Sequence, residues 1–159
     1  MTHIQQAVEL SQAECLHLLN ETYVGRVVHT HNALPEVEPV SYVMVGTAAL
    51  VRTAPGSPLA NTLDQMIVAF EVDSVSSDLR DGWTVTGVGS ADLVTDPQQY
   101  LTGRSLPPAW THGDETSAFV RIRLQLVHGR RLSTRPAPVP AGADGVDSAP
   151  AAWLWTELA

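Results

Sequence analysis

Lysine is absent from this chain of 159 residues, and all nine of its basic residues are arginine. No lysine side chain can therefore form a Schiff base or serve as a general base. Acidic residues outnumber basic ones, which gives a net charge of −8. We expect no nucleic-acid partner, because phosphate backbones are bound by basic surfaces. Arginine nevertheless suits the recognition of a carboxylate or phosphate inside a local pocket.

Cysteine is nearly absent, and long apolar runs are missing. Cys15 is the only cysteine, so no disulfide can form within the chain, which favours a reducing compartment. No apolar run approaches the ~20 residues of a membrane-spanning helix. The first residues also lack the basic and apolar regions of a signal peptide. We therefore expect a cytoplasmic protein with no membrane partner.

The composition predicts one folded domain followed by a tail. A hydrophobic content of 44% over this length is enough for a single core. We expect the domain to cover residues 1–133 and the tail to cover 134–159, where Pro, Ala and Gly dominate. The tail ends in Trp153-Leu154-Trp155. Because exposed tryptophans are costly in water, we expect this end to dock on the domain or on a second subunit.

Helix signals are few and short. Ser11 and Glu14 have the spacing of a capping box, in which the serine caps the helix and the glutamate reaches back, and this predicts a helix over 12–21. Asp96 predicts a brief helix that ends near residue 101. A third short helix is expected over 59–65.

Alternating and β-branched runs predict antiparallel strands over 24–30, 36–45, 48–53, 66–73, 82–94 and 117–127. We expect 66–73 to be buried on both faces, and the last strand to bury one face that includes Leu126. Gly87 and Gly89 predict a bulge or sharp bend, as needed where a sheet closes into a barrel. The fold class is therefore α+β, mainly antiparallel, with a small barrel and short peripheral helices.

The most informative stretch follows the strand over 48–53. Arg52 and Thr53 end that strand, a Pro-Gly turn follows, and Ser57 opens the next segment. A guanidinium, two hydroxyls and free backbone N–H groups in one turn are typical of a phosphate or other small-anion site.

Several segments, in this order, resemble the flavin-nucleotide-binding branch of the pyridoxamine 5'-phosphate oxidase-like FMN-binding split-barrel family. The resemblance covers roughly residues 10–132 and is carried by Val24-Gly25-Arg26-Val27, Pro39-Val40-Ser41-Tyr42, Arg52 to Ser57, Val68 to Asp73, and Gly82-Trp83-Thr84-Val85. It implies a split β-barrel homodimer with FMN bound between the subunits. Some members of the family use a deazaflavin cofactor or haem instead.

The resemblance also implies residue roles. Arg52, Thr53 and Ser57 would hold the FMN phosphate. The flavin ring would be lined by Pro39, Val40 and Ser41, and the ribityl chain would lie near Trp83 and Thr84. This chain has Pro58 where relatives usually have lysine, and Ser41 where they often have asparagine. The cofactor alternatives of a deazaflavin, haem or none therefore remain open.

The function expected from this resemblance is FMN binding by an oxidoreductase that acts on an unidentified small molecule. The alternative is a non-catalytic flavin carrier or a cofactor-free split-barrel interaction module. No side chain is singled out as a catalytic acid or base. His29 and His31 share one strand face without a third ligand, so we expect solvated histidines and no metal site. Arg121 and Arg123 are expected to form ion pairs on an exposed sheet face.

Overall fold

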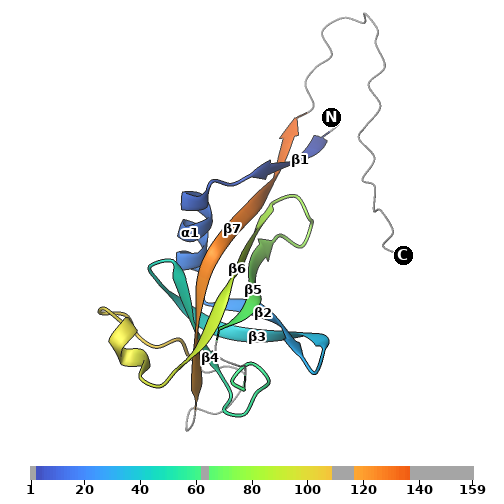
Figure 1. The fold of residues 1–159 in the computed structure, drawn as a ribbon. Coiled ribbons are helices and arrows are strands. Elements are labelled where there is room, and N and C mark those ends of the chain that lie inside the picture. Colours follow the sequence, from blue (N-terminus) through green and yellow to red (C-terminus); the bar gives the residue numbers. More distant parts are fainter. Residues whose placement is uncertain (1–2, 62–64, 109–116, 137–159) are drawn as a thin grey trace, which may run out of the picture.

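The computed structural model describes residues 3–61, 65–108 and 117–136 (Figure 1). In chain order the described elements are β1 (His3–Glu9), α1 (Gln12–Glu21), β2 (Val24–His31), β3 (Leu34–Val45), β4 (Ala48–Thr53), β5 (Met66–Val75), β6 (Gly82–Val94), the 3₁₀ helix η1 (Pro97–Tyr100) and β7 (Ala118–Pro136). The expected strands are all present. Of the expected tail, only 134–136 are described, and they continue β7; Trp153-Leu154-Trp155 lies outside the described residues.

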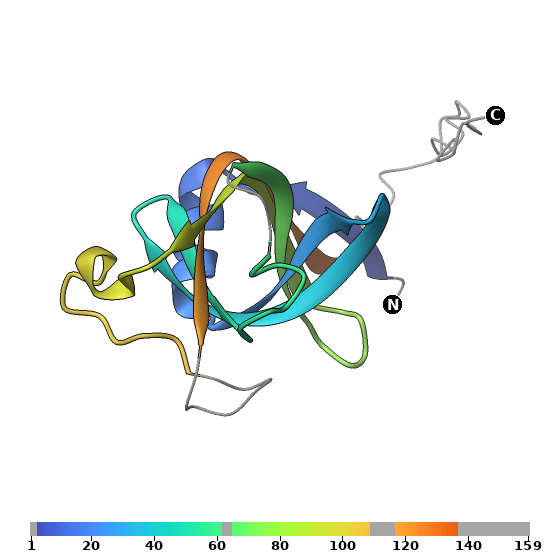
Figure 2. The same cartoon turned by 60° about the horizontal axis from the view of Figure 1, so that its bottom comes forward.

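The strands form one antiparallel sheet that closes on itself. Their order is β1-β7-β4-β3-β2-β5-β6, and β6 pairs back onto β7, so six strands make a ring. Figure 2 looks into this ring. The first strand, β1, lies outside the ring and pairs with the far half of β7. This topology confirms the predicted α+β class with a small antiparallel barrel.

The glycines of β6 lie where the barrel closes. The register between β6 and β7 shifts between Val88 and Gly89. A Cβ on Gly89 would lie 1.8 Å from the backbone oxygen of Arg123, so only glycine permits this close approach. The predicted bulge is therefore confirmed. The extra residue on β7 is Gln125, which reverses the alternation and leaves Leu126 67% exposed instead of buried.

Strand alternation places the core inside the ring. On β3, the residues Val40, Tyr42 and Met44 share one face and are buried. The expectation that 66–73 is buried on both faces is wrong, because Ile67 is 60% exposed. Only one face of β5 lines the barrel, and its buried residues are Val68, Phe70 and Val72.

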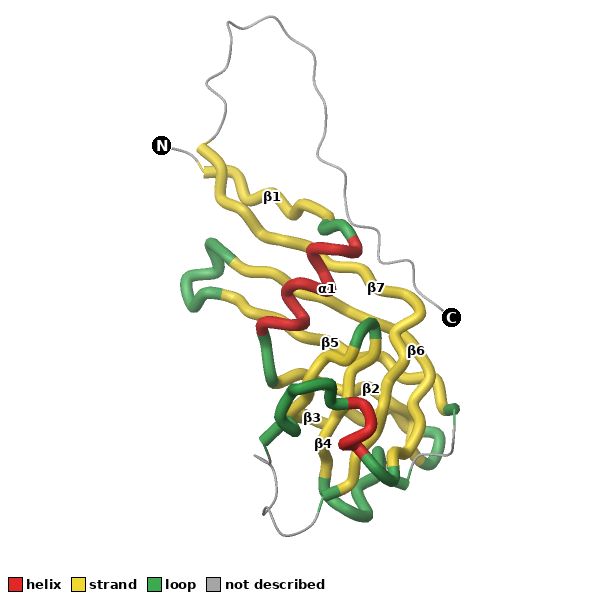
Figure 3. Tube along the Cα trace, turned by 90° about the vertical axis from the view of Figure 1, so that its left-hand side faces the viewer, coloured by secondary structure: helices red, strands yellow, loops and turns green. Residues whose placement is uncertain are grey.

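Helix α1 spans the expected residues 12–21, and the predicted capping box forms at its start. The Ser11 backbone N–H donates to Glu14 Oε2 at 2.8 Å, and Ser11 Oγ accepts from the Glu14 N–H at 3.3 Å. The helix lies beside β7 (Figure 3). It buries Cys15, Leu18 and Leu19 in the core. Among the described residues, no helix is long and apolar enough to cross a membrane.

The other two expected helices differ in outcome. The segment from Asp96 forms η1, with the Asp96 carboxylate accepting from the Gln98 N–H at 3.1 Å. The helix expected over 59–65 is not found in its described part. Residues 57–61 make a single turn instead, in which the Asn61 N–H donates to the Ser57 carbonyl at 2.9 Å, and 62–64 lie outside the described residues.

Candidate functional site

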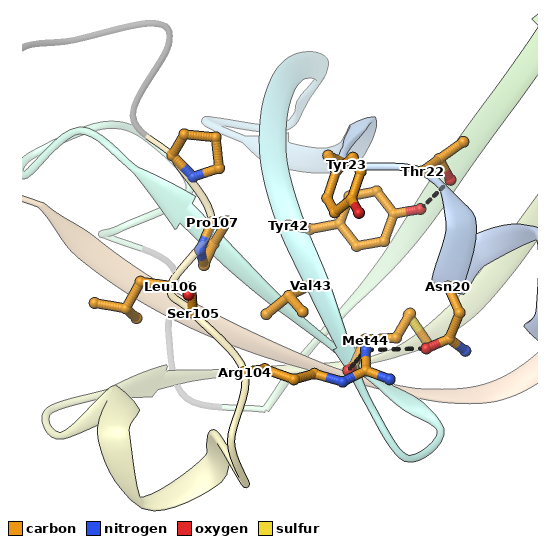
Figure 4. Close-up of a pocket in the computed structure, with 11 residues that line it drawn as sticks. Asn20, Thr22, Tyr23, Tyr42, Val43, Met44, Arg104, Ser105, Leu106 and Pro107 are labelled. Atoms are coloured by element: carbon orange, nitrogen blue, oxygen red, sulfur yellow. Dashed lines mark hydrogen bonds between the residues drawn. The ribbon is translucent and has the colours of Figure 1, made fainter.

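A pocket of about 500 Å³ lies on the outer face of β3 (Figure 4). One side comes from the end of α1 and the two residues that connect it to β2, and the floor comes from β3. The opposite side is formed by residues 104–108, here called the 104–108 segment. The lining residues are Asn20, Thr22, Tyr23, Tyr42, Val43, Met44 and 104–108. In the view of Figure 4, Val43 lies between Tyr23 and Arg104. The lining mixes aromatic and aliphatic side chains with polar groups in similar proportion, a combination that can hold a small organic ligand.

Arg104 fastens the start of the 104–108 segment to the barrel. Its Nη1 donates to the Met44 carbonyl at 2.8 Å and to Asn20 Oδ1 at 3.1 Å. These bonds join the segment to both β3 and α1. The pocket wall is therefore held by charge-assisted hydrogen bonds and not by chain connectivity alone.

Two predicted site residues hold the other end of the same segment. The Ser41 hydroxyl donates to the Pro108 carbonyl, and Arg52 Nη1 donates to the Pro107 carbonyl at 2.9 Å. Arg52 Nε also donates to Ser117 Oγ at 2.8 Å. Both residues face outward from the barrel, toward the segment that walls the pocket.

Tyr42 separates the pocket from the core. Its hydroxyl donates to the Leu19 carbonyl at 2.7 Å and lies 2.6 Å from Thr22 Oγ1. Burial raises the pKa of Tyr42 to about 12, and the hydrogen bond with Thr22 opposes that rise. At neutral pH the phenol is therefore protonated and committed to a backbone carbonyl, which makes it a structural group.

The turn after β4 gathers the hydroxyls that the sequence predicts, together with an acidic residue. Thr53 Oγ1 donates to Glu38 Oε1 and lies 3.0 Å from Ser57 Oγ. Ser57 Oγ accepts from the Ala60 N–H at 3.0 Å. We call residues 53–60 the 53–60 turn. It contains the expected hydroxyls and an N–H donor, and it is closed by a carboxylate.

The three residues implied for the phosphate do not meet at one point. Neighbouring strand residues face opposite sides of a sheet, so Arg52 faces outward while Thr53 faces inward and is buried. Thr53 and Ser57 are brought together in the 53–60 turn. Arg52 lies instead with the 104–108 segment.

The residues implied for the flavin ring also divide between the two faces of β3. Val40 is buried in the core, while Pro39 and Ser41 face outward. Val40 therefore supports the strand from behind. Ser41 is the member of this group that reaches the pocket wall.

Trp83 and Thr84 lie at the far end of β6 from these groups. Trp83 packs against the core, and the two residues border a mostly apolar groove of about 240 Å³ with Ala7, Val75, Arg130 and Leu132. Thr84 Oγ1 donates to Glu71 Oε1 at 3.3 Å. Within one copy of the chain, the structure does not bring this pair to the pocket on β3.

The structure also places the histidine and the two arginines that the sequence analysis considered outside the flavin site. His29 is 3% exposed, so the expectation of a solvated histidine is wrong for this residue. The described residues contain no group of three or more metal-ligating side chains. Asp92 pairs with Arg121 at 3.5 Å and with Arg123 at 2.9 Å, which confirms the expected ion pairs.

Sequence reasoning missed Glu38 and Arg104 as site residues. The signal for Glu38 was present, because the alternation over 36–45 places it on the same face as Val40 and Tyr42. A carboxylate on a core-facing position requires buried donors, and Thr53 supplies one. Arg104 carries no comparable signal, since its partners come from distant elements.

The chain matches the family of pyridoxamine 5'-phosphate oxidase over residues 11–131. An uncharacterised protein of Mycobacterium tuberculosis is 30% identical over 133 residues, which cover 80% of this chain and 87% of that protein. The family match includes every described element except β1 and the end of β7.

Solved structures give the same fold. A FAD-binding protein from Mycobacterium smegmatis is 27% identical, with a TM-score of 0.60 over 79% of this chain and 98% of that one. A Corynebacterium glutamicum protein assigned to the pyridoxamine 5'-phosphate oxidases is 26% identical, with a TM-score of 0.67 over 80% and 99%. The ring of strands is thus a split barrel.

Proposed function

The chain belongs to the pyridoxamine 5'-phosphate oxidase family, and we propose that it binds a flavin in the pocket on the outer face of β3. One observation carries this proposal. Ser41 and Arg52, which the resemblance implies for the cofactor, hold the wall of that pocket through the carbonyls of Pro108 and Pro107. The similarity to a FAD-binding protein of Mycobacterium smegmatis supports it.

The pocket fits the ring of a flavin better than it fits the phosphate of FMN. Tyr23, Val43 and Leu106 offer aromatic and aliphatic surface to a flat ring system. The phosphate of FMN would need free donors, whereas Arg52 is bonded to the 104–108 segment and Thr53 is bonded to Glu38. We therefore propose a flavin held through its ring, with FMN as one of the forms to be compared.

A titration tests this proposal directly. Purified protein is titrated into riboflavin, FMN and FAD, and quenching of flavin fluorescence is measured. Val43→Arg places a long charged side chain in the pocket, and we expect a loss of affinity of about tenfold or more, equal to ~1.4 kcal/mol. Val8→Arg, on the exposed face of β1, is the matched control. Failure of all three flavins to bind the unaltered protein would contradict the proposal. Binding of haem or a deazaflavin instead would identify that group as the cofactor.

We propose that the bound flavin makes the protein an oxidoreductase for a small molecule. The flavin supplies hydride or electron transfer when bound, while the chain binds and orients the ring and excludes water from one face. The phenol of Tyr42 at the pocket donates its proton to the Leu19 carbonyl, so we assign it no role as a proton donor in the reaction. Oxidation of NADH or NADPH by the flavin-loaded protein supports this role. A flavin that binds but is not reduced supports the alternative of a non-catalytic carrier.

We also propose a homodimer that forms through the outer face of the barrel. Five apolar residues stand opposite one another across five neighbouring strands, and we call them the apolar row: Val37, Val28, Ala69, Val88 and Leu126. Val37 and Leu126 are exposed in the single copy. The three residues between them, Val28, Ala69 and Val88, are half-buried. An apolar row with exposed ends is a candidate interface, and a second copy of the chain would cover it.

A further inference from the structure

The 53–60 turn is arranged to receive a negative charge, and in this chain Glu38 supplies that charge. Thr53 ends β4 with its side chain on the inner face, and Ser57 lies within hydrogen-bond distance of it. Glu38 reaches the same point from β3, where Val40 is the next residue on the same face and is buried. The three side chains come from two strands and a turn, so the arrangement is set by the fold.

Counting hydrogens gives the direction of each bond. An ionised carboxylate can only accept, so Thr53 gives its single hydroxyl hydrogen to Glu38. Ser57 must then donate to Thr53 across the 3.0 Å between their oxygens. Ser57 Oγ in turn accepts from the Ala60 N–H at 3.0 Å. Every hydrogen in this chain of bonds points toward Glu38, which is the polarity of an anion site.

A buried histidine stands on the other side of the carboxylate. His29 Nε2 lies 3.8 Å from Glu38 Oε2, which is beyond hydrogen-bond distance. The two ring nitrogens of His29 have no hydrogen-bond partner among the described residues. Glu38 therefore lies between the hydroxyls of the 53–60 turn and an imidazole, with 21% of its side chain exposed. A carboxylate in this position is stabilised by its donors and leaves little room for a second anion.

We propose that Glu38 determines the specificity of the proposed flavin site, because its carboxylate occupies the anion position of the 53–60 turn. A phosphate brought to Thr53 and Ser57 would meet a like charge, and it would find the Thr53 hydrogen already donated. The turn therefore adds nothing to the affinity for FMN over riboflavin. This inference rests on the proposed flavin binding for its ligand, but the occupancy of the turn can be tested without any flavin.

Inorganic phosphate is the first probe, and thermal unfolding is the readout. Glu38→Ala empties the anion position, and Glu38→Gln removes the charge while keeping the size of the side chain. We expect phosphate, compared with chloride at equal ionic strength, to raise the melting temperature of Glu38→Ala more than that of the unaltered protein. Glu36→Gln is the matched control, because it removes the same charge from the same face of β3. Comparing variants in the same buffer cancels the general stabilisation that phosphate gives to most proteins.

The ratio of FMN to riboflavin affinity is the second readout. We expect a ratio near one for the unaltered protein and for Glu36→Gln. In a Glu38 variant we expect the ratio to rise about tenfold, which corresponds to ~1.4 kcal/mol of added phosphate binding. Riboflavin affinity itself should change little, since the ring site on β3 is separate from the turn.

Each outcome decides one proposal. A preference of the unaltered protein for FMN of tenfold or more would overturn the role of Glu38. The role of Glu38 would also be overturned if both Glu38 variants showed the same rise in melting temperature with phosphate, and the same FMN-to-riboflavin affinity ratio, as the unaltered protein. If riboflavin, FMN and FAD all fail to bind, flavin binding is wrong, and the phosphate measurement alone decides whether Glu38 occupies the turn. Circular dichroism of each variant confirms that it has folded.

Discussion

Ser41 and Arg52 stand directly opposite each other in the register of β3 and β4, and their side chains hold two consecutive carbonyl groups. Ser41 donates to Pro108 and Arg52 donates to Pro107. The pair therefore acts as a double anchor for the wall of the pocket. This arrangement gives the two residues a role that does not depend on a phosphate.

Replacing Arg52 distinguishes two roles for this residue, which are anchoring the 104–108 segment and binding a phosphate. We expect Arg52→Ala to lower the free energy of unfolding by about 1–3 kcal/mol, because the hydrogen bonds that Arg52 donates to the Pro107 carbonyl and to Ser117 are lost. If Arg52 holds the wall, affinity for riboflavin and for FMN should fall by the same factor. Urea unfolding and flavin titration measure the two effects, and Arg80→Ala in the exposed 76–81 turn is the control. A loss confined to FMN would identify Arg52 as a phosphate ligand instead.

Leu126 offers a direct test of the homodimer. Leu126→Glu places a charge at one end of the apolar row, where the side chain is exposed in the single copy, so the barrel itself should fold. We expect the dimer to dissociate at micromolar concentration, because burying an unpaired carboxylate is costly. Sedimentation velocity reports the change. Leu79→Glu, at a side chain 62% exposed in the 76–81 turn, should leave the oligomeric state unaltered. A protein that is monomeric before any substitution would refute the proposed interface.

The closure of the barrel depends on Gly89. Gly89→Ala places a Cβ against the backbone of Arg123, where no side chain can move aside, and we expect a loss of stability of several kcal/mol or failure to fold. Gly46→Ala is the informative contrast. That glycine has open space around it but a φ of +61°, so we expect a cost of only about 1 kcal/mol. Equal unfolding midpoints in urea for the two variants would contradict this account.

Tyr42 predicts a pH dependence at alkaline pH. The pKa of the phenol rises from 10.0 to about 12 on folding, so the folded state keeps a proton that the unfolded chain loses. The stabilisation linked to this proton is complete below pH 10 and is lost as the pH rises from 10 to 12. We expect Tyr42→Phe to be less stable at neutral pH by about 1 kcal/mol, because the hydroxyl bond to Leu19 is lost.

The difference in free energy of unfolding between the unaltered protein and Tyr42→Phe should narrow above pH 10. Chemical denaturation at several pH values would measure it. Tyr23→Phe is the matched control, because that side chain is exposed and should show no such convergence. A difference in stability that stays constant up to pH 12 would show that the phenol ionises equally in both states.

Local patterns were enough for the elements whose signals lie within a few residues. The capping box of Ser11 and Glu14 predicts α1, and it forms as expected. The alternation around Tyr42 correctly separates the core face of β3 from its outer face. Gly87 and Gly89 mark the bulge, because a Cβ would lie 2.7 Å from the Leu124 side chain at Gly87 and 1.8 Å from the Arg123 backbone oxygen at Gly89. The first two signals depend only on backbone geometry that neighbouring residues share, whereas the glycines leave room for the partner strand β7.

Other features were decided by partners that are distant in the sequence. The exposure of Leu126 follows from the extra residue at Gln125, which exists only because β7 must match a bent β6. Strand β1 escapes prediction because its partner, the far end of β7, lies more than a hundred residues away.

The candidate site shows the same division between sequence and tertiary structure. The sequence by itself places Arg52, Thr53 and Ser57 within six positions, and it places Glu38 on the core face of β3. Only the pairing of β3 with β4 brings Glu38 to Thr53 and turns Arg52 away toward Pro107. A turn rich in donors can be recognised from its residues. The barrel decides which anion occupies the 53–60 turn, because closure of the ring determines which side chains meet inside the barrel.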